Sequence, residues 1–110
     1  MKIRLGFVSN SSSTSFIITN LTDQEKSLVD FVNETPELVE EFNEQYEYEY
    51  TQEEMLKSAE ENDIIFQPHE SKEVVFGDEQ RTTIGRVYDY ILRDGVDSPS
   101  FKVRFSEMLR

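Results

Sequence analysis

The chain has 110 residues, which suits one compact domain, and 36% of them are hydrophobic, with eight Phe and five Tyr supplying bulk. Its formal net charge is −12, and it contains no cysteine, which excludes disulfides, thiol catalysis and cysteine-based zinc sites. No apolar run approaches the about 18 residues that a membrane-spanning helix needs, and residues 1–8 are too short an apolar stretch for a signal peptide. We therefore expect a single domain, residues 1–110, that is soluble and cytoplasmic, with no cofactor and no contact with a membrane.

The charge is unevenly distributed along the chain. Residues 23–80 carry 19 acidic side chains against three lysines, whereas the segments before and after them are mildly basic. Such an acidic region repels the backbone of DNA or RNA, so direct binding of nucleic acid is not expected. The same region attracts and steers proteins with basic surfaces. The charge pattern therefore predicts a protein partner with a basic surface.

The amino-terminal part combines apolar residues with a run of hydroxyl side chains. Residues 2–8 predict a short strand, and the β-branched segment Ser15–Thr19 predicts a second one. We expect the polar run between them to form an exposed loop at residues 9–15. Phosphorylation or a similar modification there would add charge where none exists, while a flexible connector or a phosphate-binding loop are the alternatives. The candidate modification residues are Ser9, Ser11, Ser12, Ser13, Thr14 and Ser15.

The middle of the chain predicts helices. Thr22 and Glu25 have the spacing of a capping box, which predicts a helix from there to Glu34. Thr51 and Glu54 repeat the pattern and predict another helix to about residue 62. Between them, residues 36–46 predict a helix that begins at a proline. Its inward arc, on a wheel of about 100° per residue, contains Leu38, Val39, Phe42 and Tyr46.

The second half of the chain mixes strands and one helix. Residues 63–66 and 73–76 are short β-rich runs that predict a hairpin. A helix is expected from residue 82 or 83 to residue 93, with Arg86, Asp89 and Arg93 on its outer face. Residues 101–105 alternate strictly and predict a strand with one buried face. The order of elements favours the α+β class, with about four helices packed on a small, mainly antiparallel sheet.

One amino-terminal segment resembles part of a known group of proteins. It spans residues 6–16 and reads Gly-Phe-Val-Ser-Asn-Ser-Ser-Ser-Thr-Ser-Phe. The segment resembles an amino-terminal signature of assorted small proteins of bacteriophages and bacteria, most of them uncharacterised. Thr14 stands where the signature has another serine. The resemblance implies a phage or prophage context, and it implies no catalytic role because the signature occurs on bodies of different kinds.

Carboxylates gather on the two helices in the middle of the chain and on the segment between them. Lys57 is the one basic residue between residues 37 and 61. A surface dense in carboxylates can imitate the spaced charges of a nucleic acid and occupy a basic groove of another protein. A solvated helix face is the alternative, and the spacing fits no EF-hand, so no metal site is expected. The candidate partner-binding residues are Glu37, Glu40, Glu41, Glu44, Glu47, Glu49, Glu53 and Glu54.

Other side chains carry weaker signals. His69 is the single histidine, and its polar surroundings predict a surface position without a nucleophile to activate. Basic residues of the last third of the chain, Arg81, Arg86, Arg93, Lys102 and Arg104, could pair with the acidic helices within the domain or in a homo-oligomer. Tyr46, Tyr48, Tyr50 and Tyr90 are candidate interface anchors, since tyrosine is enriched at interfaces.

Taken together, these patterns predict a small acidic, non-enzymatic protein of phage type. We expect it to bind and inhibit a host or phage protein through its carboxylate-rich helices, as a nucleic-acid mimic. The alternative is a structural or assembly protein whose serine-rich amino-terminal arm is recognised or modified.

Overall fold

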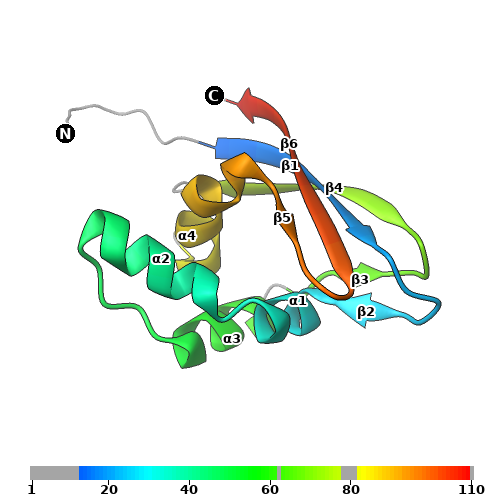
Figure 1. Ribbon diagram of the computed structural model, residues 1–110, viewed down its shortest axis with the longest axis horizontal. Coiled ribbons are helices and arrows are strands. Elements are labelled where there is room, and N and C mark those ends of the chain that lie inside the picture. The colour runs from blue at the N-terminus through cyan, green and yellow to red at the C-terminus, as the bar shows by residue number, and fades with distance from the viewer. Residues whose placement is uncertain (1–12, 62, 78–81, 110) are drawn as a thin grey trace.

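The computed structural model describes residues 13–61, 63–77 and 82–109 (Figure 1). The strand predicted at residues 2–8 lies outside this part, as do Ser9, Ser11 and Ser12 of the predicted loop. The described residues form four α-helices and a mainly antiparallel sheet, so the predicted α+β class is confirmed.

The main sheet has four antiparallel strands in the order β4, β1, β6, β5. Phe16 of β1 lies opposite Val74 on one side and Phe105 on the other, and Ile18 lies opposite Val103. Because side chains alternate along a strand, this register places the apolar residues of three strands on one face. The strands are β1 (Ser13–Asn20), β4 (Ser71–Gly77), β5 (Val96–Asp97) and β6 (Phe101–Leu109).

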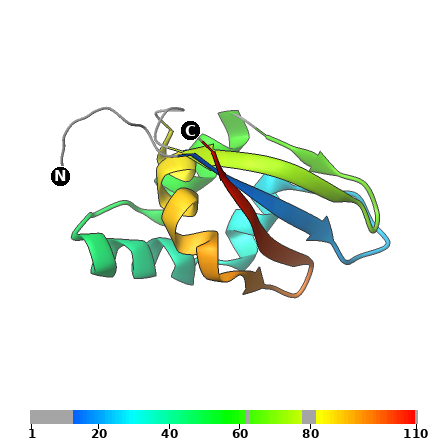
Figure 2. The same ribbon diagram turned by 90° about the horizontal axis from the view of Figure 1, so that it is seen from above.

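The helices gather on one side of this sheet, with α4 beside it and α2 farther away (Figure 1). Seen from above, the three long strands run side by side, and α2 lies at the end of the molecule opposite the tip of the sheet (Figure 2). A turn of 3₁₀ helix, η2 (Leu92–Asp94), follows α4. The helices are α1 (Leu28–Glu34), α2 (Glu37–Tyr46), α3 (Gln52–Glu61) and α4 (Thr83–Ile91).

One continuous core joins the helices to the sheet. Phe31 of α1 lies edge-on to Tyr88 of α4 and to Phe101 of β6, with 5.5 Å between ring centroids in both pairs. Phe76 of β4 also contacts the Tyr88 ring, with 5.3 Å between the centroids. Edge-to-face pairs of this kind add to the free energy gained by burying the rings. These four aromatic rings therefore lie at the centre of the fold.

The first helix begins later than predicted. It begins at Leu28 because the Ser27 amide donates to the Asp30 carboxylate (2.9 Å) and the Ser27 hydroxyl accepts from the Asp30 amide. Thr22 does not cap a helix; its amide and hydroxyl both donate to Oδ1 of Asn20, at 2.9 and 2.7 Å. By contrast, the capping box at Thr51 and Glu54 is confirmed: the Glu54 carboxylate accepts from the Thr51 amide at 2.9 Å.

The predicted hairpin of residues 63–66 and 73–76 is wrong. The first run contributes β3 (Ile65–Phe66), which pairs with β2 (Lys26–Ser27) in a separate small sheet. The second run belongs to β4, which pairs with β1 over seven residues. The longer ladder with β1 satisfies more backbone groups than a short hairpin would, and local sequence does not reveal this distant partner.

Candidate functional site: an acidic surface with a tyrosine cluster

The eight glutamates predicted to bind a partner are all exposed. They are carried by α2, by α3 and by the linker between the two helices. α2 buries Leu38, Val39 and Phe42, and α3 buries Met55, Ser58 and Ala59, which leaves the glutamates on the opposite sides. We call this set the acidic surface: Glu37, Glu40, Glu41, Glu44, Glu47, Glu49, Glu53 and Glu54.

No residue of the acidic surface takes part in an ion pair within residues 13–61, 63–77 and 82–109. The Glu54 carboxylate accepts hydrogen bonds from Thr51, which leave its charge in place. Two of the basic side chains in the last third of the chain pair with acids outside the acidic surface: Arg93 with Asp89 at 3.1 Å, and Arg104 with Asp97 at 2.9 Å. Arg81 lies outside the described residues. The hydrogen bond from Arg104 lowers the pKa of Asp97.

A cluster of aromatic rings lies beside the acidic surface, around the buried ring of Phe42. We call the four surrounding residues, Tyr46, Tyr48, Tyr50 and Tyr90, the tyrosine cluster. The distances from the Phe42 ring centroid to theirs range from 4.9 Å for Tyr46 to 6.3 Å for Tyr90. The rings also contact one another, because Tyr48 stacks on Tyr50 at 5.2 Å and Tyr46 packs on Tyr90 at 5.4 Å.

The linker that carries two of these rings is held by Asn43 of α2. Its side-chain amide donates to the carbonyl oxygen of Tyr50 at 2.7 Å, and its Oδ1 accepts from the amide of Tyr50 at 3.0 Å. Glu47 ends α2 in the left-handed conformation, with φ of 59°, and its backbone amide donates to Asn43. The bidentate contact therefore fixes how Tyr48 and Tyr50 fold back on the helix.

The tyrosine cluster surrounds a surface hollow of about 460 Å³ lined by Phe42, Tyr46, Tyr48, Arg86 and Tyr90. Tyr46 and Tyr48 are 44% and 42% exposed. The prediction that Tyr46 lies in the core with Phe42 is therefore wrong. Its ring sits on the rim because Phe42 and Tyr90 already fill the space beneath it. All four tyrosines proposed as interface anchors meet in this one cluster.

Two arginines of α4 and η2 contact the inner rings of the cluster. Nη1 of Arg86 donates to the Tyr50 hydroxyl at 2.9 Å, and the Arg93 guanidinium lies 4.8 Å from the centroid of the Tyr90 ring. Neither Tyr46 nor Tyr48 has a cation of the described residues over its ring. The inner rings therefore bind the chain's own guanidinium groups, while the outer rings face solvent.

The hydroxyl run is not an exposed loop over its last three residues. Ser13, Thr14 and Ser15 belong to β1 and are buried, so the expectation of exposure is wrong for them. Two of the three hydroxyls have acidic partners, because Thr14 donates to Asp89 at 2.5 Å and Ser15 donates to Glu73. A kinase-type enzyme cannot reach a buried hydroxyl, so the folded chain offers none of these three for modification, while Ser9, Ser11 and Ser12 lie outside the described residues.

The predicted position of Asp89 is also wrong. The wheel predicts Asp89 on the outer face of the last helix, but the residue is fully buried. Thr14, at the amino-terminal end of β1, reaches this side of α4, and Thr14 and Arg93 both donate to the Asp89 carboxylate. A buried carboxylate is tolerated only where such donors surround it.

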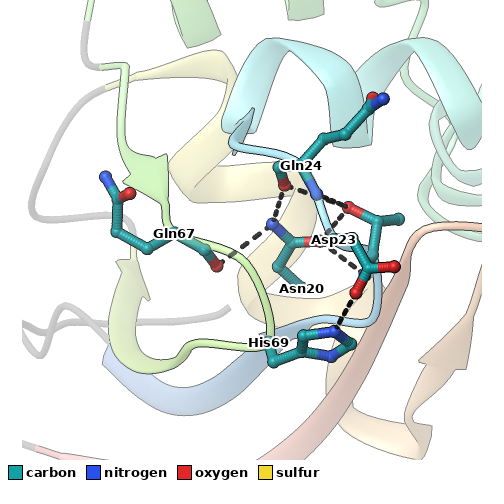
Figure 3. Close-up of polar contacts among 6 residues, drawn as sticks. Asn20, Asp23, Gln24, Gln67 and His69 are labelled. Carbon is teal, nitrogen blue, oxygen red and sulfur yellow. Dashed lines mark hydrogen bonds and ion pairs between the residues drawn. The ribbon is translucent and has the colours of Figure 1, made fainter.

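His69 is exposed, as predicted, and it lies at the tip between β3 and β4 (Figure 3). Its Nε2 is 2.6 Å from a carboxylate oxygen of Asp23, and its backbone has a φ of 59°. In the same close-up the Asn20 amide bridges the carbonyl oxygens of Gln24 and Gln67, at 2.7 and 3.1 Å. These contacts tie two loops together, and none of them presents a nucleophile beside the imidazole.

The described residues contain no group of three or more His, Cys, Asp or Glu side chains arranged to hold a metal ion. Likewise, none of the helices in the described part is both long and apolar enough to cross a bilayer. No family model matches the chain, and the searches of curated proteins and of solved structures found no similar protein. The acidic surface and the tyrosine cluster are therefore the features from which function is argued.

Proposed function

We propose that the protein is a non-enzymatic binding protein that uses its acidic surface to occupy a basic, nucleic-acid-binding groove of another protein. The observation that carries the proposal is that eight exposed glutamates on adjacent segments have no ion-pair partner in the described chain. Unneutralised charges of one sign raise the rate of encounter with an oppositely charged surface. The amino-terminal resemblance supports a phage or prophage setting, in which the partner is a host or phage protein.

The tyrosine cluster supports binding by supplying apolar area next to the charge. Binding energy at protein interfaces concentrates in buried aromatic and arginine side chains, whereas charges at the rim contribute mainly to the association rate. Tyr46 and Tyr48 provide such aromatic area directly beside Glu44, Glu47 and Glu49 in the chain. A surface of solvated carboxylates alone would lack this component.

The test combines capture with competition. The tagged protein is used to capture partners from a bacterial extract at rising salt, and each identified partner is then assayed for DNA binding with and without the protein. We expect capture of a nucleic-acid-binding protein that is released above a few hundred millimolar salt, since exposed charges are screened within about 10 Å at roughly 0.1 M salt. We also expect the protein to displace DNA from that partner.

Charge-reversed variants make the test specific. The variant Glu37→Lys, Glu41→Lys and Glu44→Lys should fold but lose both capture and competition. The matched control reverses three exposed acids elsewhere, Glu25, Asp94 and Glu107, which changes the net charge equally. If the first variant still captures and competes, or if both variants lose binding alike, the acidic surface is not the binding site.

A further inference from the structure

The outer rings of the tyrosine cluster form a rigid aromatic surface. Tyr48 is held by stacking on Tyr50 with an interplanar angle of 17°, and Tyr46 is held between Phe42 and Tyr90. The Asn43 contacts hold the linker itself. A ring that is already fixed loses little conformational entropy when a ligand packs against it, which favours binding. The two rings are thus preorganised while remaining more than two-fifths exposed.

The charge around these rings selects a cation. Glu47 stands between Tyr46 and Tyr48 in the chain and Glu49 follows Tyr48, so their backbones are neighbours. Both glutamates are exposed and have no ion-pair partner in the described residues. An aromatic face carries partial negative charge and attracts cations as well. Rings and carboxylates together therefore favour a positively charged group that can also pack against an aromatic face.

The cluster already binds guanidinium groups from its own chain. Arg93 lies over the ring of Tyr90, and Arg86 donates to the hydroxyl of Tyr50. Arginine suits such sites better than lysine because its guanidinium is planar, weakly hydrated and able to stack on an aromatic face while donating hydrogen bonds from its edge. Arg86 also lines the hollow, and its positive charge opposes a second cation beside it. The exposed rings of Tyr46 and Tyr48 are therefore where an incoming cation is expected to bind.

We propose that Tyr46 and Tyr48 bind an arginine side chain of the protein partner, with its guanidinium stacked on a ring and its edge donating to Glu47 or Glu49. This inference rests on the proposed function and deepens it, since it names the partner group that the acidic surface recognises. Stacking on these rings makes the interaction selective for arginine over lysine. A surface of carboxylates alone would bind the two side chains with similar affinity.

The experiment titrates the protein with oligo-arginine and oligo-lysine peptides of equal length, by calorimetry at low and moderate salt. We expect the arginine peptide to bind about three- to tenfold more tightly, in line with one stacked cation. The double variant Tyr46→Leu and Tyr48→Leu should bind both peptides with equal affinity. The control Tyr46→Phe and Tyr48→Phe keeps the ring faces, so it should retain the preference.

A second measurement does not depend on the variants folding. In NMR spectra of the unsubstituted protein, the arginine peptide should shift the ring protons of Tyr46 and Tyr48 more than the lysine peptide does. Equal affinity for the two peptides, together with unshifted rings, would overturn the arginine site but leave the proposed function standing. If neither peptide binds, both proposals fail. If the leucine variant keeps its preference for arginine, the site lies elsewhere.

Discussion

The hydroxyl of Thr14 donates a 2.5 Å hydrogen bond to the carboxylate of Asp89, although the two residues are 75 positions apart in the chain. Both side chains are fully buried. Arg93, one turn beyond Asp89 on the same helical stretch, pairs with the same carboxylate oxygen at 3.1 Å. The contact joins the first residues of β1 to α4, so a segment that looks like a polar linker is part of the fold.

This contact predicts a large effect of small substitutions. Thr14→Val and Asp89→Asn should each lower the free energy of unfolding by about 2 kcal/mol, because each leaves a buried polar group without its charged hydrogen bond. The double variant should lose less than the sum, since both changes remove one shared interaction. Urea denaturation of the four proteins measures these values.

The control for that series lies on the same strand. Thr19 shares an exposed hydroxyl contact with Ser71 at 2.7 Å. Thr19→Val should therefore change stability by less than about 0.5 kcal/mol. Additive effects of Thr14→Val and Asp89→Asn would show that the two residues do not interact in solution.

Removal of the Tyr88 hydroxyl should have the opposite effect on stability. Its phenol oxygen is buried, and no described residue makes a hydrogen bond to it. Tyr88→Phe should leave stability unchanged or raise it by up to about 1 kcal/mol, because the buried hydroxyl gains nothing in exchange for its lost hydration. A loss of more than that by thermal denaturation would reveal a partner for the phenol.

The same residue predicts a dependence on alkaline pH. Burial of the phenol raises the pKa of Tyr88 above its ordinary value. A pKa that is higher in the folded than in the unfolded chain gives stability that is complete below about pH 10 and falls as the pH rises further. Tyr88→Phe should flatten this alkaline decline relative to the unsubstituted protein when urea denaturation is compared across pH, and an unchanged decline would show that Tyr88 does not cause it.

The sequence predicted those elements whose signals are local and periodic. The apolar face of α2, apart from Tyr46, and the capping box of α3 are visible within one element, and they are confirmed. Two capping patterns compete near residues 22–30, and the one at Ser27 prevails because Asn20 binds Thr22. That choice depends on a tertiary contact, which local rules do not contain.

Only part of the candidate site could be predicted, because local patterns place its glutamates while tertiary contacts assemble its tyrosines. Helix periodicity places six of the eight glutamates on the surface, and the other two, Glu47 and Glu49, are exposed on the linker between α2 and α3. The tyrosine cluster needs Tyr90 of α4 to meet the linker, which is a contact between distant segments. The alternation Glu47-Tyr48-Glu49-Tyr50 beside Phe42 was its one sequence signal. Burial of Asp89 had a weaker signal, the Arg93 four residues later.

Gly95 ends η2 with a backbone that only glycine adopts easily, at φ of 81° and ψ of 154°. A Cβ there would also lie 3.2 Å from the carbonyl oxygen of Val103. Gly95→Ala should therefore destabilise the fold by about 1–3 kcal/mol. Asp94→Ala at the neighbouring exposed position is the control, and chemical denaturation compares them. Equal stability of the two variants would contradict the strained conformation.

Asn43 links the stability of the fold to the binding surface, because it is the residue that holds the linker at Tyr50. In Asn43→Asp the shape is kept, but the donor to the Tyr50 carbonyl oxygen becomes a carboxylate oxygen that repels it. We expect a loss of about 1–3 kcal/mol in the free energy of unfolding. We also expect a weaker near-ultraviolet circular dichroism signal from the tyrosines and a smaller preference for the arginine peptide.

Gln45→Glu adds the same charge at an exposed position of α2 and should change none of these. If both variants lower the arginine preference equally, charge rather than the position of the linker controls it, and the preorganisation of Tyr48 is disproved.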